Sequence, residues 1–231
     1  MKTIFLRHQT LVVLLLAIAA LTLPMVMLQP TAAQDSKAKV QVGVLKYAGN
    51  KTSKCFANGF LKTVAENTRI DVHREFVPAV LSEDTVYQFP FLIMSGEGEF
   101  ELSDDEKRIF KSYLQRGGFI LASAGCSSQS WADSFRELMK ELFPDQPMAQ
   151  LPLDHPLMRT IYALDSLPTR RKDVAGYLEG VAIEGRLVVV FSAMGLNDTE
   201  NAGGGCCCCG GNELVDAHRL NANLLAYVLT H

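Results

Sequence analysis

The sequence predicts an α/β fold in which helices cover both faces of a mostly parallel sheet, a three-layer sandwich. Two observations predict this class. The apolar runs 91–94 and 119–122 are unbroken, which is typical of strands that are covered on both faces. Segments with helical periodicity alternate with such runs, and right-handed crossovers then favour a doubly wound sheet.

The first two predicted strands are residues 40–47, which alternate apolar and polar positions, and residues 70–77. A helix is expected between them, with Thr52 or Ser53 as its cap. Its apolar positions recur at helical spacing and predict the face that packs on the sheet: Phe56, Phe60, Leu61 and Val64.

The next two strands, 91–94 and 119–122, are separated by the clearest helix of the chain. Residues 103–106 form a capping box, and Gly117-Gly118 ends the helical pattern. After the fourth strand, a further helix is predicted from its apolar stripe: Trp131, Phe135, Leu138, Met139 and Leu142.

The last third of the chain is less regular. Residues 177–183 and 186–191 are interpreted as a hairpin that turns at Glu184-Gly185, with two successive sheet strands as the alternative. Asn212 is expected to cap a final helix that runs to about Leu229. The stripe of that helix comprises Leu214, His218, Asn221 or Ala222, Leu225 and Leu229.

The amino terminus is interpreted as a secretory signal peptide. Lys2 and Arg7 precede an apolar stretch, residues 11–23, and small residues before Gln34 suit cleavage after residue 33. An uncleaved membrane anchor is the alternative. Either way, the sequence predicts a periplasmic or secreted location, with residues 34–231 as one α/β domain.

Charge argues against a nucleic-acid partner. Without the predicted signal, the chain carries 20 basic and 25 acidic residues, a net charge of −5. Its longest basic run is Arg170-Arg171-Lys172, which is typical of a solvated turn. We expect a small molecule or an envelope protein as the partner, and contact with a membrane only if the signal stays uncleaved.

Several spaced motifs resemble a family of domains of unknown function, family 4159. They are Leu45-Lys46-Tyr47-Ala48-Gly49, residues 89–96, Leu102-Ser103-Asp104, Gly117-Gly118-Phe119 and residues 151–156. The resemblance covers residues 40–230. It implies a relation to class I glutamine-amidotransferase-like and trehalose-utilisation-type folds, and hence a flavodoxin-like sheet. Family members often have Gly-His-Gly after the third strand, where this chain has Gly96-Glu97-Gly98.

The carboxyl ends of the third and fourth strands are the expected ligand site, because open parallel sheets bind ligands beyond that edge. The predicted ligand-binding residues are Ser95, Gly96, Glu97 and Gly98. Glu97, Glu99 and Glu101 could act as acid, base or ligand. The alternative is a solvated acidic loop before a helix amino terminus, where negative charge is favourable.

Cys126 follows the fourth strand, near the position where amidotransferase relatives place a nucleophilic cysteine on a strand-to-helix turn. The motif is incomplete, because Ala124 and Ser128 stand where it requires glycine. His155 is the candidate base. The simpler role of Asp154-His155-Pro156 is to begin a helix, with Asp154 or His155 at the cap.

Cys206, Cys207, Cys208 and Cys209 form an uninterrupted run within a glycine-rich segment. With Cys55 and Cys126 they make an even six, which in an oxidising compartment favours disulfides of undetermined pairing. Metal binding is the second interpretation, with His218 as a nitrogen ligand and Zn²⁺ or Cu⁺ as the ion that suits thiolates. The third interpretation is an insertion without selected chemistry.

Two functional classes follow. The first is a non-catalytic binding module of the cell envelope, with its ligand at the carboxyl ends of the strands. The second is a thiol-dependent protein, either a metal or redox module that uses residues 206–209 or a hydrolase that uses Cys126. The missing base and orienting carboxylate favour the binding module.

Overall fold

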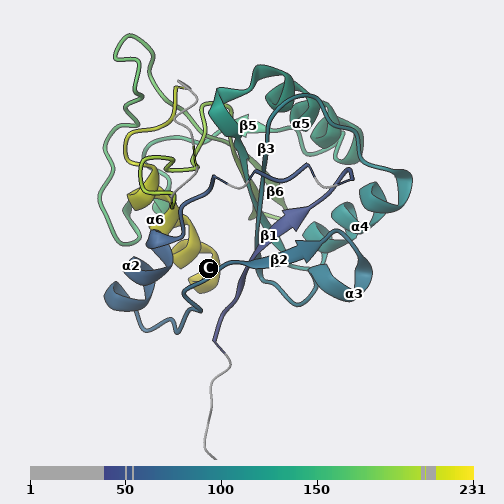
Figure 1. Ribbon diagram of the computed structural model, residues 1–231, viewed down its shortest axis with the longest axis horizontal. Helices are drawn as coiled ribbons and strands as arrows, with labels where there is room; N and C mark the ends of the chain where they lie inside the picture. Colours follow the sequence, from purple (N-terminus) through teal and green to yellow (C-terminus); the bar gives the residue numbers. More distant parts are fainter. Residues whose placement is uncertain (1–38, 50, 54, 204–205, 207–211) are drawn as a thin grey trace, which may run out of the picture. The chain divides into compact units, whose positions relative to one another are not determined.

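The computed structural model describes residues 39–49, 51–53, 55–203, 206 and 212–231. Within them, a seven-stranded sheet has the order β2-β1-β3-β4-β7-β6-β5 (Figure 1). The strands are β1 (Val42–Lys46), β2 (Val77–Val80), β3 (Phe91–Gly96), β4 (Phe119–Ala124), β5 (Ala149–Gln150), β6 (Glu179–Ile183) and β7 (Arg186–Ser192).

Five neighbouring strands of the sheet pair in parallel, in the order β2, β1, β3, β4 and β7. The strands β6 and β5 extend the sheet beyond β7 as an antiparallel edge. The parallel part has the 2-1-3-4-5 order of flavodoxin-like sheets, with β7 in the fifth place. The predicted fold class is therefore confirmed.

Helices cover both faces of this sheet (Figure 1). One face carries α3 (Glu83–Val86), α4 (Asp104–Gln115) and α5 (Gln129–Leu142), and the other carries α2 (Gly59–Asn67) and α6 (Ala217–Thr230). Short 3-10 helices span Gly125–Ser127 and Pro156–Arg159.

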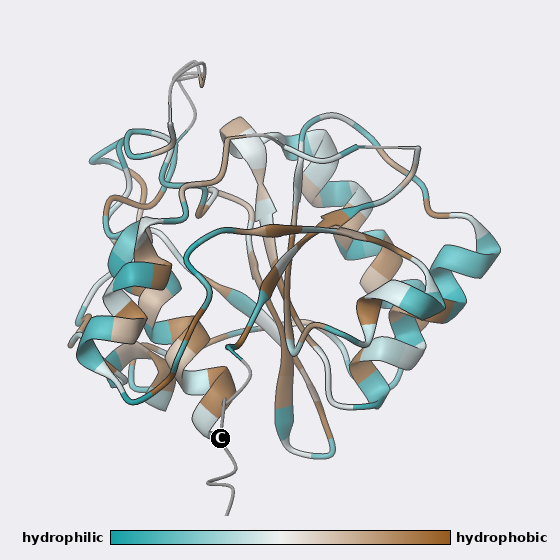
Figure 2. Cartoon of the chain, turned by 60° about the horizontal axis from the view of Figure 1, so that its bottom comes forward, coloured by the Kyte–Doolittle hydropathy of each residue, from teal (hydrophilic) through white to brown (hydrophobic). Residues whose placement is uncertain are grey.

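Two separate hydrophobic cores hold the three layers together. β3 and β4 are buried along their whole length because alternate side chains enter opposite cores. Leu92 and Ile120 face α4 and α5, whereas Ile93 and Leu121 face α2 and α6. Figure 2 shows the same division, with the apolar colour concentrated in the sheet and in the helix faces turned toward it.

Several predicted local features are confirmed. Ser103 and Glu106 form the capping box of α4, because the Ser103 hydroxyl accepts from the Glu106 amide and the Glu106 carboxylate accepts from the Ser103 amide. β6 and β7 form the predicted hairpin. Its turn places Glu184 at φ 51° and Gly185 at φ 79°, as the tight turns of hairpins require.

The second strand was predicted seven residues too early. Residues 70–77 contribute one isolated bridge, Val72 to Val40, and the strand proper is β2. β2 contains Pro78, which an edge strand tolerates because one side of its backbone needs no partner. The local sequence of residues 70–77 gave no information about which segment lies in register with β1.

The predicted caps of two helices are wrong. α2 begins at Gly59 after Asn58, whereas the Thr52 hydroxyl donates to the Leu45 carbonyl. α6 begins at Ala217 after Asp216. The Asn212 side chain instead accepts from the Arg171 amide at 2.6 Å. Polar side chains at both predicted caps found tertiary partners that local sequence could not indicate.

Candidate functional site

The loops after β3 and β4 lie side by side, as predicted. Gly96 pairs with Ala124 at the ends of the two strands, and the Gly98 amide donates to the Ser128 hydroxyl at 3.0 Å. A Cβ on Gly125 would lie 3.0 Å from the Gly96 carbonyl oxygen. The two loops therefore form one continuous surface at the carboxyl edge of the sheet.

Cys126 and Ser127 occupy a strained stretch of this surface. Their φ angles are 51° and 55°, in the left-handed region that ordinary residues avoid and that is concentrated at functional sites. The Ser127 hydroxyl is fully used, because it donates to the Met194 carbonyl at 2.7 Å and accepts from the Asn212 amide at 2.6 Å. These bonds hold the strained turn in place.

The Cys126 sulfur lies 3.2 Å from the Glu97 carboxylate. Cys126 is disulfide-bonded, so its sulfur carries no proton, and the contact is a sulfur–oxygen contact rather than a thiol hydrogen bond. Nucleophilic attack requires a thiolate, which this oxidised state does not provide. The predicted catalytic role of Cys126 remains a prediction.

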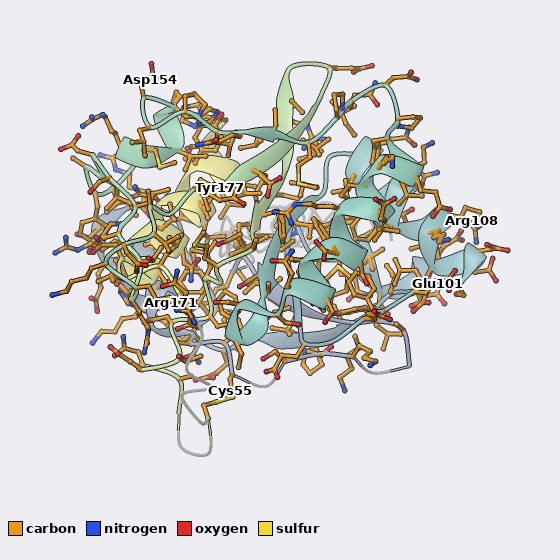
Figure 3. The ribbon with its side chains drawn as sticks, turned by 90° about the horizontal axis from the view of Figure 1, so that it is seen from above. Cys55, Glu101, Arg108, Asp154, Arg171 and Tyr177 are labelled. Carbon is orange, nitrogen blue, oxygen red and sulfur yellow. A yellow bond between two sulfur atoms is a disulfide. The ribbon has the colours of Figure 1, made fainter. Side chains whose placement is uncertain are left out.

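His155 lies at the other end of the sheet from Cys126. Its ring contacts Tyr227, with centroids 5.3 Å apart, and Tyr227 lines a hollow with Gly117 and Arg186, which precede β4 and begin β7. β4 has six residues at about 3.3 Å each, which separates its ends by roughly 20 Å. Figure 3 likewise places Asp154, the neighbour of His155, and Cys55 at opposite margins of the domain.

The simpler prediction for His155 is confirmed. It is the N-cap of the 3-10 helix Pro156–Arg159, and its Nδ1 accepts from the Leu157 amide at 3.2 Å. Burial lowers the pKa of His155, an effect that the Asp154 carboxylate opposes and that His231 reinforces. The structure thus keeps this ring neutral as a hydrogen-bond acceptor.

Two of the four predicted ligand-binding residues are buried. The Ser95 hydroxyl donates to the Asn197 side chain at 3.1 Å. Gly96 is packed so closely that a Cβ would lie 2.5 Å from the Tyr47 hydroxyl and 2.7 Å from the Trp131 nitrogen. Ser95 and Gly96 therefore support the loop, and Glu97 and Gly98 are the residues that reach solvent.

A buried polar network beneath the loops was not predicted. Asn197 accepts from Ser95 and from the Ser123 hydroxyl, the latter at 2.6 Å, and its amide donates to Ser53 at 3.4 Å. The Leu196 amide donates to Ser123 at 2.7 Å. This network joins the segments after β1 and β7 to β3 and β4. Serines inside otherwise apolar strands were its sequence signal.

An aromatic pair supports Gly96 from below. The Trp131 ring nitrogen donates to the Tyr47 hydroxyl at 2.6 Å, and both side chains are buried. Burial raises the pKa of Tyr47, although the bond from Trp131 lowers it in part. Tyr47 is therefore neutral at physiological pH, and Trp131 is a core residue, as predicted.

Two residues of the predicted metal site, Cys206 and His218, have other partners. Cys206 forms a disulfide with Cys55, and Cys207, Cys208 and Cys209 lie outside the described residues. The two ring nitrogens of His218 lie 2.9 Å from the Thr63 hydroxyl and 3.6 Å from Asp198 Oδ2. Across the described part of the chain, no three His, Cys, Asp or Glu side chains are grouped to hold a metal ion.

Asp198 is the buried member of that contact. Burial raises the pKa of its carboxyl, against the lowering effects of the Asn201 amide and of His218. The Nδ1–Oδ2 separation is long for a hydrogen bond, and Oδ2 accepts none from the residues the structure describes. We interpret this pair as a structural contact that links α6 to the loop after β7.

A hollow of about 700 Å³, which we call the α5 groove, begins near the carboxyl edge of the sheet. It lies between the loop that follows Gly98 and the outer face of α5. Its lining comprises Glu99, Phe100, Glu101, Leu102, Lys107, Gln129, Ser130, Asp133, Ser134, Glu137, Leu138 and Glu141. Figure 3 labels Glu101 at the same margin of the domain as Arg108 of α4.

The α5 side of this groove was missed in the sequence. Asp133, Glu137 and Glu141 follow one another at intervals of four residues, so they form a single row along the helix. The helix was predicted from its apolar stripe alone. The acidic row on its polar face was the available signal, but an acidic helix face is usually just solvated.

These observations define the class of the protein: a flavodoxin-like α/β domain with two adjoining loops at the carboxyl ends of its strands and a groove along α5. Residues 38–229 match the family described as a domain of unknown function, DUF4159, and the chain belongs to that family. No curated protein matches the sequence.

The Cys55–Cys206 disulfide indicates an oxidising environment outside the cytoplasm. Of the helices that the structure describes, none has the length and apolarity that a membrane span requires.

Proposed function

We propose that this protein is a non-catalytic binding module of the cell envelope, periplasmic or secreted, whose ligand or partner binds in the α5 groove. One observation carries the proposal: the groove begins at the segment that follows Glu97 and Gly98, next to the edge where open parallel sheets bind their ligands, and continues along α5 to Glu141. Its volume of about 700 Å³ is within the range of ligand sites.

The surroundings of the edge support binding rather than catalysis. The Cys126 sulfur is held in a disulfide, and His155 serves as a helix cap at the opposite end of the sheet. The network around Asn197 and the tight packing of Gly96 make the loop beside the groove rigid. Such preorganisation favours binding, because little freedom is lost when a ligand arrives.

The location is supported by the disulfide and by the predicted signal peptide. Fractionation of cells that express the full chain should recover the protein outside the cytoplasm, and intact mass should place the mature amino terminus at Gln34. A full-length chain in the cytoplasmic fraction would contradict this part of the proposal.

The binding proposal is tested by thermal shift with a library of amino acids, dipeptides, sugars and polyamines. Ser130→Phe places a ring in the groove without changing its charge, and Gln115→Phe is the matched control on the exposed end of α4. We expect a compound that raises the Tm of the wild type and of Gln115→Phe but leaves Ser130→Phe unchanged. No such compound, or equal stabilisation of all three proteins, would overturn the proposal.

A further inference from the structure

We infer that the α5 groove binds an extended peptide segment in which lysine or arginine side chains alternate with apolar ones. This inference rests on the proposed function and adds the chemical class of the partner. It follows from three properties of the groove: the charge of its rim, the apolar surface between its walls and the spacing of its carboxylates.

The rim of the groove is strongly acidic. Five carboxylates line it, against one ammonium, which gives a formal charge of −4 where the whole chain has −3. They are Glu99, Glu101, Asp133, Glu137 and Glu141. The Lys107 ammonium already forms ion pairs with Glu141 at 2.9 Å and with Glu101 at 3.9 Å. An anionic ligand is therefore disfavoured, and a polycation is complementary.

Glu101 and Glu137 are the carboxylates most available to a partner, because Asp133 already accepts from the Gln129 amide at 2.7 Å and lies 3.6 Å from Arg136. Side-chain exposure is 87% for Glu101 and 75% for Glu137. The nearest cation to Glu137 is Lys140 at 3.5 Å, an exposed pair one helical turn apart that contributes little. A bound cation would thus replace water and weak contacts rather than break a buried ion pair.

Between the acidic walls, the groove presents apolar surface. Phe100 is half-buried, and its ring is held by Tyr47 at 5.2 Å and by Trp131 at 5.4 Å between centroids. Leu102 and Leu138 lie behind it and are only 3% and 5% exposed, so Phe100 is the main apolar side chain that the groove offers. Hydrated metal ions would make no use of it, whereas the methylene stems of lysine and arginine and apolar side chains would.

The spacing of the carboxylates favours an extended peptide. Asp133, Glu137 and Glu141 are four residues apart, which is about 6 Å of helix rise per step. In an extended chain, side chains on the same side repeat every two residues, about 6.6 Å. Cations at alternate positions would face this row, and the apolar side chains between them would turn toward Phe100.

The test uses the end-labelled heptapeptide Lys-Leu-Lys-Leu-Lys-Leu-Lys and fluorescence anisotropy with the full domain. The controls are a peptide of the same composition with its lysines and leucines in two blocks, the glutamate–leucine counterpart, and spermidine as a competitor. We expect the alternating peptide to bind at least about fivefold more tightly than either control peptide. Raising salt from 20 to 150 mM should weaken its binding severalfold, since exposed charges are screened.

Glu137→Lys reverses one charge of the row and should weaken binding by about tenfold, while Glu66→Lys, a reversal on α2 across the sheet, should change it less than twofold. Far-UV circular dichroism and melting verify that both variants fold. The inference would be overturned if the blocked peptide binds as tightly as the alternating one, or if Glu137→Lys leaves the affinity unchanged. It would also be overturned if spermidine, at the same concentration of positive charge, displaces the alternating peptide completely. The proposed function would still stand, without this inference, if a library compound raises the Tm of the wild type but not that of Ser130→Phe.

Discussion

Gly96 shows how a single residue fixes the edge of the sheet. Its Cα lies against the Tyr47 hydroxyl, the Lys51 carbonyl and the Trp131 ring, with no room for a further carbon atom. From the sequence, Gly96 was predicted to contact a ligand. The protein's own aromatic pair occupies the space instead.

Gly96→Ala should destabilise the domain by about 1–3 kcal/mol, because the added Cβ would overlap backbone and buried side-chain atoms that cannot move freely. Gly203→Ala is the control, since a Cβ there meets no atom of the described residues within 4 Å. Urea denaturation measures both. Equal free energies of unfolding for the two variants would contradict the packing described around Gly96.

His155 should make the domain less stable as the pH becomes acidic. Its folded pKa is lowered, so its contribution is complete above the ordinary histidine pKa near 6.5 and is lost as pH falls below that value. His155→Asn keeps an acceptor for the Leu157 amide but does not titrate. The fall in unfolding free energy between pH 7.5 and 5.5 should therefore be smaller in this variant.

His73→Asn, at an exposed histidine, is the matched control for this comparison and should retain the pH dependence of the wild type. Denaturation curves at several pH values give the required slopes. If His155→Asn keeps the wild-type slope, protonation of His155 is not what destabilises the domain.

At the scale of elements, α4 is the part that local sequence determines most completely. Its capping box satisfies amides of the first turn, and Glu106 also accepts from the Ala48 amide at 2.9 Å, which ties the helix to the segment after β1. Buried residues at helical spacing then fix the face that packs on the sheet: Ile109, Phe110, Tyr113 and Leu114.

Ser103→Ala should cost about 1 kcal/mol of unfolding free energy, because the Glu106 amide loses its capping acceptor. Ser103→Thr keeps a hydroxyl at the cap and should lose much less. Thermal or urea denaturation of the two variants makes the comparison. An equal loss in both would mean that the hydroxyl bond is not the stabilising contact.

For the whole molecule, the Cys55–Cys206 disulfide closes a loop of 151 residues. A cross-link over such a separation restricts the unfolded chain strongly. Removing it with Cys55→Ala/Cys206→Ala should lower the free energy of unfolding by about 2–5 kcal/mol under oxidising conditions.

Adding reductant supplies the control for that prediction. It should destabilise the wild type more than the double variant, because only the wild type has this cross-link to lose. Unfolding free energies that coincide for the two proteins before reduction would contradict a stabilising role for the disulfide.

By itself, the sequence determined the fold class, the positions of β3, β4, α4 and α5, the β6–β7 hairpin and the juxtaposition of the two loops. Each depends on local periodicity, caps or turns, or on the rule that parallel strands end at one edge. It also predicted a location outside the cytoplasm from its amino terminus and, for such a location, favoured disulfides because the number of cysteines is even.

Only the tertiary structure decided the rest. The β2 register, the pairing of Cys55 with Cys206, the Asn197 network and the separation of His155 from Cys126 all join residues that are distant in sequence. The α5 groove likewise combines a loop with a helix more than twenty residues further along the chain. Local patterns carry no information about such contacts, because the free energy that selects them comes from packing in three dimensions.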